Sequence, residues 1–485
     1  MKLGAALGVG ASKLLISLAV LAAGFRAVSD DDYARVVIAE RVVELPRLDP
    51  SGTSWLPLPF WVYGAGLRLL GGGLGAARVT AVFLGVCSVL LLLSAARKLG
   101  AGNVGAATGA LVAGLFPWSA WLGAATVPEA PAAALMLYAL STLATATLRD
   151  RVLGAVAVAA ACFSRYEAWP VALGFAAFTA YDAARAATTP YGAANSPPVA
   201  ENTPYLRAAP LLATAAVAVG PIVLWLLHGT FVHGDTLFFW KRVAGYRHAL
   251  GESPPLFERL LAVPRSLFAE EPELWLGLPF ALPSLRRSRY ARPALVSVLL
   301  LAFLAAGELS GGGPTHHAGR AALPIWYLVA LALGHAAGES WDARSARRVQ
   351  WLALTAGVAG VGWLFRALVP PGFPDRDAAV RIGTEARTRR APGLLIDTPD
   401  YSYFAVMAAF GRPAVAEPFD DHDPRRPRPP DAFTSEDALR ARWAARPGAW
   451  LVVSRVHAEI ASRAGRVMTE TPEFALVAPA PKTRL

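Results

Sequence analysis

Long apolar runs separated by short polar segments dominate the first three quarters of this 485-residue chain. A helix that crosses a bilayer needs about 20 mostly apolar residues. The first run resembles a signal sequence, but more runs follow it, so we interpret it as an uncleaved anchor. The pattern predicts a polytopic α-helical membrane protein with about eleven spans, near residues 5–27, 76–96, 103–118, 129–148, 151–163, 168–181, 209–228, 272–285, 293–307, 321–338 and 350–369.

The pattern changes after residue 369, where soluble composition replaces the long apolar runs. Short apolar stretches there predict strands, and segments with helical periodicity predict helices. The strands are expected at 394–396, 450–453 and 474–477, and the helices at 401–410 and 437–445. We therefore divide the chain into a membrane domain, 1–369, with its first outer loop at 29–75, and a small α/β domain, 370–485. The stretch 420–431, rich in Pro, Arg and Asp, is expected to be an exposed loop.

Composition agrees with a membrane protein. Hydrophobic residues make up 55% of the chain and charged residues 17%, and the mean hydropathy is +0.41, whereas a soluble domain carries about 25% charged residues. The net charge of +11 does not indicate nucleic-acid binding, because no basic stripe is interleaved with aromatic residues. Cys87 and Cys162 lie inside apolar runs without metal-ligand spacing, so we interpret both as inert thiols.

Positive charge gathers in alternate loops, which predicts the orientation. With a cytoplasmic N-terminus, five successive basic loops fall inside, as the positive-inside rule requires; they contain Arg97 and Lys98, Arg149 and Arg151, Arg185 and Arg207, Arg286 to Arg292, and Arg344 to Arg348. An odd number of spans then places the C-terminal domain outside. The Ala- and Arg-rich composition suggests a bacterial genome, and hence a multi-pass protein of the bacterial inner (cytoplasmic) membrane.

Three consecutive aspartates, Asp30, Asp31 and Asp32, follow the first span. Ionisable groups are costly beside hydrocarbon and are usually kept there for a function. One aspartate would act as a general base, while a neighbour orients it or raises its pKa by like-charge repulsion. The alternative is a solvated helix cap, in which Ser29 or Asp30 caps a helix through 33–43.

Other polar residues fall on the same predicted face. Glu129 begins a span between two prolines, either as a second acid of the site or as a first-turn residue favoured by the helix dipole. Arg165 can bind a phosphate through two parallel hydrogen bonds, and Tyr166 can line a sugar. The alternative for this stretch is a local pair of Arg165 with Glu167 inside an aromatic belt.

Two further basic groups lie in outer loops. His316 and Arg320 are four residues apart, so on a helix they share one face and form a cradle for a phosphate. Metal binding by His316 and His317 lacks a third ligand at helical spacing, and an incidental loop is the alternative. Lys241 and Arg242 follow three aromatic residues; they either grip a lipid phosphate or anchor the chain at the interface.

These features together resemble the GT-C membrane glycosyltransferases, which include protein O-mannosyltransferases and the aminoarabinose transferases of lipid A. The acidic motif of that family follows its first span, as Asp30, Asp31 and Asp32 do here. The His-x-x-x-Arg-x-x-x-Pro motif of its mannosyltransferase branches matches His316, Arg320 and Pro324. The resemblance covers residues 5–369 and implies a polyprenyl-phosphate-linked sugar as donor. No cofactor is expected, and metal dependence stays open.

The sequence thus favours an inverting glycosyltransferase acting on a lipid, glycan or protein hydroxyl, and within the triplet we favour Asp31 as the base. A phosphate leaves without needing a proton, so a single base suffices. A transporter or flippase of a lipid-linked sugar would instead require charges at the midplane and paired broken helices. A structural assembly protein would leave the acidic residues without a purpose.

Overall fold

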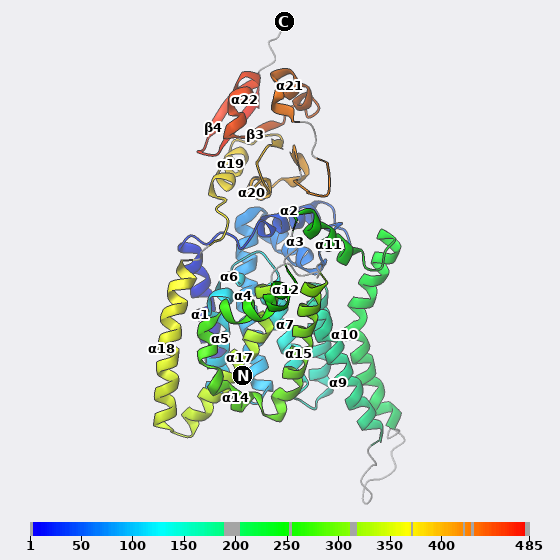
Figure 1. The fold of residues 1–485 in the computed structure, drawn as a ribbon, viewed down its shortest axis with the longest axis vertical. Helices are drawn as coiled ribbons and strands as arrows, with labels where there is room; N and C mark the ends of the chain where they lie inside the picture. The colour runs from blue at the N-terminus through cyan, green and yellow to red at the C-terminus, as the bar shows by residue number, and fades with distance from the viewer. Residues whose placement is uncertain are drawn as a thin grey trace, which may run out of the picture.

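The structure, a computed structural model, describes residues 3–188, 204–251, 255–310, 318–369, 372–420, 422–427 and 431–480. A bundle of helices carries a small sheet domain at one end (Figure 1). Among the described residues, five helices are long and apolar enough to cross a membrane: α1 (Leu3–Ala22), α4 (Gly73–Lys98), α10 (Pro204–His233), α15 (Ser288–Leu309) and α18 (Ala346–Leu368). The bundle also contains α5 (Asn103–Leu115), α6 (Pro117–Leu122), α7 (Glu129–Thr142), α8 (Leu148–Cys162), α9 (Ala168–Thr188) and α17 (Leu323–Asp342).

Two predicted spans are divided, so their prediction as single helices was wrong. The run 103–118 breaks between α5 and α6 at Phe116, whose backbone is extended because a residue that precedes a proline is disfavoured in the helical region. The run 272–285 forms α13 (Pro272–Leu276) and α14 (Leu278–Leu285), joined at Gly277. Pro279 has no N–H to donate to the preceding turn. The total of eleven spans stays a prediction.

Helices α5 and α17 pack with their backbones in close approach. Each contributes glycines four residues apart, Gly105 and Gly109 on α5 and Gly334 and Gly338 on α17. A Cβ added at Gly334 would lie 2.2 Å from the backbone nitrogen of Gly109. Such pairs of small residues allow helices to pack closely in membranes, where no hydrophobic effect drives helices together. This contact fixes the centre of the bundle.

The helices nearest the sheet domain are α2 (Asp31–Glu44), α3 (Leu58–Leu70) and α11 (Phe238–Ala249) (Figure 1). The helix predicted through 33–43 is confirmed as α2, and Tyr33, Val36 and Ala39 are all buried. Further along the chain, α12 (Leu256–Ala269) and the short α16 (Ala318–Ala321) complete the bundle. The segment between α2 and α3 therefore lies at the boundary between the two parts of the molecule.

The sheet domain has the strand order β2-β1-β3-β5-β4. Strand β1 (Leu394–Ile396) pairs in parallel with β2 (Ala416–Pro418) and β3 (Trp450–Ser454), while β5 (Phe474–Pro479) pairs antiparallel with β3 and β4 (Gly465–Glu470). Its helices are α19 (Asp377–Thr388), α20 (Tyr403–Phe410), α21 (Glu436–Ala444) and α22 (Ala458–Ala464). The three predicted strands and two predicted helices are present, whereas β2, β4, α19 and α22 were not predicted.

A shared apolar core joins the two parts. Tyr33 and Val36 of α2 belong to the same buried cluster as Met407 and Phe410 of α20 and Leu476 of β5. Burying apolar side chains contributes roughly 25 cal/mol per Å². The sheet domain is therefore packed against the bundle through α2, which carries the aspartate triplet at its start.

Glu40 lies at this junction and makes stability depend on pH. It is 5% exposed, and its Oε1 accepts a hydrogen bond of 3.1 Å from the Gly73 backbone nitrogen. Burial raises the pKa of Glu40 from 4.5 to about 8. The folded protein then keeps a proton that the unfolded chain releases, so the contribution of Glu40 to stability falls as pH rises from 4.5 to about 8.

We therefore expect Glu40→Gln to flatten the pH dependence of stability. The melting temperature of the unmodified protein should fall between pH 5 and pH 8 by more than that of the variant, because the amide cannot ionise. Thermal unfolding of the detergent-solubilised protein measures this difference. Glu459→Gln is the control, since the Glu459 side chain is 77% exposed. Parallel curves for Glu40→Gln and the unmodified protein would contradict the prediction.

Candidate active site

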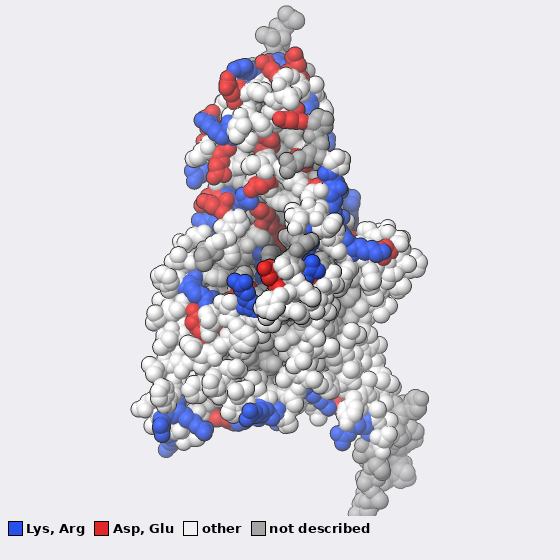
Figure 2. All heavy atoms as spheres, in the orientation of Figure 1, with Lys and Arg blue, Asp and Glu red and all other residues white. Residues whose placement is uncertain are grey.

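Charged side chains from separate parts of the chain meet where the bundle joins the sheet domain. The face drawn in Figure 2 has a broad belt of uncharged atoms, with basic side chains at the far end and mixed charges near the sheet domain. The group at the junction, called here the junction cluster, consists of Asp31, Asp32, Arg35, Arg78, Glu129, Arg165, Glu167 and Arg320. Desolvated charges of this kind are costly unless they are paired or used.

Asp30 occupies the N-cap position of α2, but its side chain does not cap the helix, so the predicted capping role was wrong. Its two carboxylate oxygens each lie 2.8 Å from a nitrogen of Arg376, Nε and Nη2. Arg376 also pairs with Asp400 at 2.8 Å. This bidentate arrangement is the strong form of a charge-assisted hydrogen bond. Asp30 therefore fastens the start of α2 to the sheet domain.

Asp32 is fully buried and holds the backbone around it. Its Oδ2 accepts from the Val28 nitrogen at 3.1 Å, and its Oδ1 accepts from the Thr126 nitrogen at 3.0 Å. The Thr126 hydroxyl donates to the Asp32 carbonyl at 2.7 Å. Arg78 lies 3.8 Å from Oδ1. With both oxygens engaged, Asp32 ties the first turn of α2 to the segment before α7.

Asp31 and Arg35 differ from their neighbours. Asp31 is partly exposed, and its side chain makes no hydrogen bond or ion pair with any other residue that the structure describes. Arg35 follows it by four residues, so both lie on one face of α2. The Arg35 guanidinium lies 4.6 Å from the centre of the Trp55 ring, and its buried Nε has no hydrogen-bond partner among the described residues. Among the residues that the structure describes, an acid and a cation without ion-pair partners thus lie one turn apart on α2.

Glu129 lies close to two arginines from distant segments of the chain. Its side chain is 2% exposed, and its Oε1 lies 3.2 Å from Arg165 Nη1 and 3.8 Å from Arg320 Nη1. Arg165 Nε donates to Glu167 Oε1 at 2.7 Å, so the local pair considered from the sequence is present. Arg320 also donates to the Val28 carbonyl at 3.1 Å. The structure therefore brings Glu129, Arg165, Glu167 and Arg320 together beside the aspartates, as predicted.

Tyr166 does not face this cluster, so its predicted role in lining a sugar is not supported. Its hydroxyl donates to the Ser54 carbonyl at 2.6 Å and accepts from Trp225 Nε1 at 3.0 Å. Its ring stacks on Phe239 with the centroids 4.5 Å apart. Tyr166 therefore packs the segment between α2 and α3 against α10 and α11.

The remaining predicted residues lie away from the cluster or outside the described residues. Lys241 is 73% exposed and pairs with Asp235 at 2.6 Å, which disfavours its predicted role in gripping a lipid phosphate. The backbone carbonyl of Arg242 accepts from Arg425 at 3.4 Å. The segment 420–431, predicted to be exposed, therefore touches α11 through Arg425. His316 and His317 lie outside the described residues.

No family model matches the chain, and no curated protein matches it in sequence. Among solved structures, ArnT from Cupriavidus metallidurans bound to undecaprenyl phosphate matches with a TM-score of 0.63 at 15% identity over 99% of each chain. The apo form of that protein matches with a TM-score of 0.56 at 15% identity, over 96% of this chain and 97% of its own. An oligosaccharyltransferase from Archaeoglobus fulgidus, in complex with Zn and sulfate, matches with a TM-score of 0.51 at 14% identity. This match covers 92% of this chain and 68% of the oligosaccharyltransferase.

The chain shares the fold of ArnT. The expectation of a polytopic helical bundle with a small C-terminal sheet domain is confirmed. At these identities the likeness concerns the fold, and the role of each residue has to be argued from its own surroundings.

Sequence reasoning missed Arg35 and Arg78 as members of the cluster. Arg35 follows Asp31 by four residues on a helix that was itself predicted, so the i, i+4 spacing was the available signal. Arg78 lies near the start of an apolar run. A charge at such a position usually has a function or a buried partner, and this was the available signal. Its partner, Asp32, belongs to another element.

Asp30→Asn and Arg376→Gln are expected to destabilise the domain junction non-additively. The two side chains are 24% and 16% exposed, and contacting pairs of this kind show coupling energies of about 0.5–3 kcal/mol. The shifts in melting temperature of the single variants should therefore sum to more than the shift of the double variant. Arg389→Gln is the control, because Arg389, directly after α19, pairs with Glu385 of that helix. Strict additivity of the first two shifts would contradict the prediction.

Proposed function

We propose that this protein is a membrane glycosyltransferase that moves a sugar from a polyprenyl-phosphate donor to a hydroxyl acceptor. The observation that carries the proposal is the pair formed by Asp31, an unpaired carboxylate, and Arg35, whose buried Nε has no partner among the described residues. The pair lies where the apolar bundle ends, the level at which the phosphate of a membrane lipid would lie. The GT-C fold supports the proposal, since the ArnT neighbour binds undecaprenyl phosphate.

The chemistry is a single displacement. The acceptor oxygen attacks the anomeric carbon, and the bond from that carbon to the phosphate oxygen breaks with its electron pair. Asp31 takes the proton of the acceptor hydroxyl as general base. The polyprenyl phosphate leaves as an anion and needs no proton. Because the acceptor attacks the face opposite the leaving phosphate in one step, the reaction inverts the configuration at the anomeric carbon.

Arg35 is the cation best placed to stabilise the departing phosphate. The other arginines of the junction cluster already have carboxylate partners: Arg78 has Asp32, Arg165 has Glu129 and Glu167, and Arg320 has Glu129. A planar guanidinium also matches phosphate geometry with two parallel hydrogen bonds. Glu129 and its two arginines then form a fixed wall that excludes water and orients the reacting groups.

The decisive experiment supplies purified protein with a panel of radiolabelled polyprenyl-phosphate sugars and a bacterial membrane extract as the source of acceptors. One donor should be consumed, polyprenyl phosphate should be released, and label should appear in an acceptor fraction. Asp31→Asn should slow all three strongly. Movement of intact donor across the bilayer of a vesicle, without release of polyprenyl phosphate, would identify a transporter instead.

The proposed orientation places the N-terminus in the cytoplasm and the sheet domain outside. It is supported by the basic side chains gathered at the end of the bundle away from the sheet domain (Figure 2). A reporter enzyme fused to the C-terminus should be active only when it is outside the cytoplasm. Cytoplasmic reporter activity would contradict both the orientation and an outer-face reaction.

A further inference from the structure

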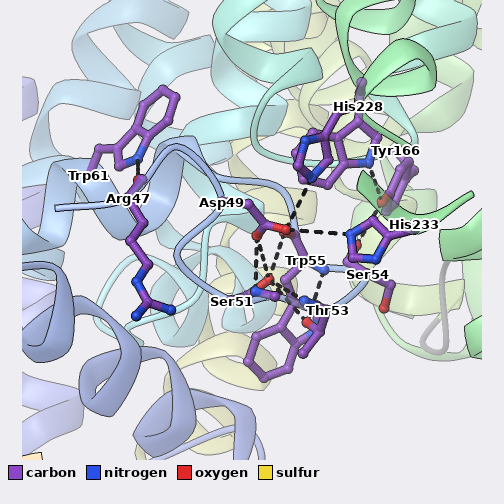
Figure 3. Close-up of polar contacts among 12 residues, drawn as sticks. Arg47, Asp49, Ser51, Thr53, Ser54, Trp55, Trp61, Tyr166, His228 and His233 are labelled. Carbon is purple, nitrogen blue, oxygen red and sulfur yellow. Dashed lines mark hydrogen bonds and ion pairs between the residues drawn. The ribbon is translucent and has the colours of Figure 1, made fainter. Parts of the chain in front are cut away.

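Three potential metal ligands converge outside the junction cluster. Asp49 lies in the segment between α2 and α3, and His228 and His233 lie near the end of α10 (Figure 3). His228 Nε2 is 3.2 Å and His233 Nε2 is 3.8 Å from the same Asp49 oxygen, Oδ2. The three ligand atoms all lie within 4.8 Å of one another. His228 and His233 have four residues between them, a spacing within the range of zinc ligands, but Asp49 lies 179 residues from His228.

Neighbouring residues contact one carboxylate oxygen of Asp49 and leave the other facing the two histidines. Its other oxygen, Oδ1, lies 3.2 Å from the Ser51 hydroxyl oxygen and accepts from the Gly52 backbone nitrogen at 3.0 Å. These contacts orient Oδ2 toward the two imidazoles, as Figure 3 shows. Orientation of a ligating carboxylate by further hydrogen bonds is a regular feature of metal sites.

Aromatic stacking holds both imidazoles. The His228 ring stacks on Trp225 with the centroids 4.8 Å apart, and the His233 ring stacks on Phe238 at 4.0 Å. The angles between the ring planes are 24° and 15° respectively. With both ring planes fixed in this way, each histidine presents Nε2 to Asp49.

We propose that Asp49, His228 and His233 bind one Zn²⁺. A hydrogen bond would account for the position of His228 beside Asp49 Oδ2. His233, at 3.8 Å from the same oxygen, is too distant to be hydrogen-bonded to it. Tetrahedral zinc with bonds of about 2.0–2.2 Å places its ligand atoms roughly 3.3–3.6 Å apart. The two carboxylate–imidazole separations, 3.2 and 3.8 Å, approach these values. Calcium and magnesium take oxygen ligands, so two nitrogen donors favour zinc.

Zinc at this position would fasten the segment between α2 and α3 to α10. Ser51 bridges Asp49 to Trp55, because its hydroxyl oxygen also lies 3.1 Å from the Trp55 carbonyl oxygen. Trp55 in turn supports Arg35, whose guanidinium lies 4.6 Å from its ring. The metal would thus act as a positioning group for Arg35, a consequence that rests on the proposed function, whereas binding itself does not.

The test measures bound metal and stability rather than transfer. Protein purified without chelator should contain about one zinc per chain by elemental mass spectrometry, and EDTA-stripped protein should gain melting temperature when ZnCl₂ is added. His233→Ala and Asp49→Asn should lose both effects. His457→Ala is the matched control, because His457 Nδ1 lies 2.8 Å from Asp397 Oδ2 in a histidine–carboxylate pair that belongs to no three-ligand group among the described residues.

In EDTA, His233→Ala and the unmodified protein should unfold at similar temperatures and diverge only when zinc is added. The proposal is overturned if the unmodified protein holds no zinc and its melting temperature does not respond to ZnCl₂. It is also overturned if His457→Ala lowers the zinc content as much as His233→Ala. A variant that fails to fold leaves the titration of the unmodified protein as the deciding measurement. None of these readouts depends on glycosyl transfer, so failure of the proposed function would be seen separately.

Discussion

Asp31→Asn is expected to lower the rate of sugar transfer by about 100-fold to 10,000-fold while leaving the protein folded. The amide retains the shape of the carboxylate but cannot accept the proton of the acceptor hydroxyl. The Asp31 side chain makes no hydrogen bond or ion pair with another described residue, so its replacement breaks no such contact of the fold. The initial rate of polyprenyl phosphate release measures the loss, and the melting temperature measures folding.

The neighbouring aspartates provide matched controls for this prediction. Asp30→Asn should retain transfer activity, because its carboxylate is bound by Arg376. Asp32→Asn should lose stability and activity together, because the new amide N–H₂ would face the Val28 or Thr126 N–H group that now donates to the carboxylate. Full activity of Asp31→Asn, or an equal loss in Asp30→Asn at unchanged stability, would show that Asp31 is not the base.

The fold was largely predictable because long apolar runs leave few alternatives in a membrane. The predicted elements fail where local chemistry overrides the average apolar character. Pro117 and Pro279 divide two runs whose hydrophobicity predicted continuous helices. In the sheet domain, β2 has three residues, one of them Pro418, and three residues of β4 are exposed. Neither strand has the buried apolar alternation that identifies a strand in a sequence.

The sequence was sufficient to predict which residues form the site, but not which partner each of them has. Successive residues of a helix point about 100° apart, so three consecutive aspartates face three different surroundings. Which surroundings each one meets depends on partners far along the chain, since Arg376 lies 346 residues from Asp30. The same holds for Tyr166, whose hydroxyl donates to a carbonyl 112 residues away. Short motifs identify candidate residues, whereas tertiary contacts decide which of them stay free.

Arg35→Gln is expected to lower kcat by about 100-fold to 1,000-fold, the usual effect of removing one preorganised donor from a developing anion. Arg35 is the arginine of the junction cluster without a carboxylate partner among the described residues, so its charge is available when the phosphate departs. Steady-state kinetics with the donor that the unmodified protein consumes measures kcat and KM separately. Because the charge on the phosphate increases as the bond breaks, the loss should appear mainly in kcat.

Arg35→Lys separates charge from geometry in this prediction. Lysine retains the positive charge but lacks the planar fork that binds a phosphate with two parallel hydrogen bonds, so an intermediate rate is expected. Arg41→Gln is the control on the same helix, because Arg41 is exposed and should not affect transfer. If Arg35→Gln proved as active as Arg41→Gln, the departing phosphate would be held by the arginines around Glu129, and the paired side of the junction cluster would be its electrostatic centre.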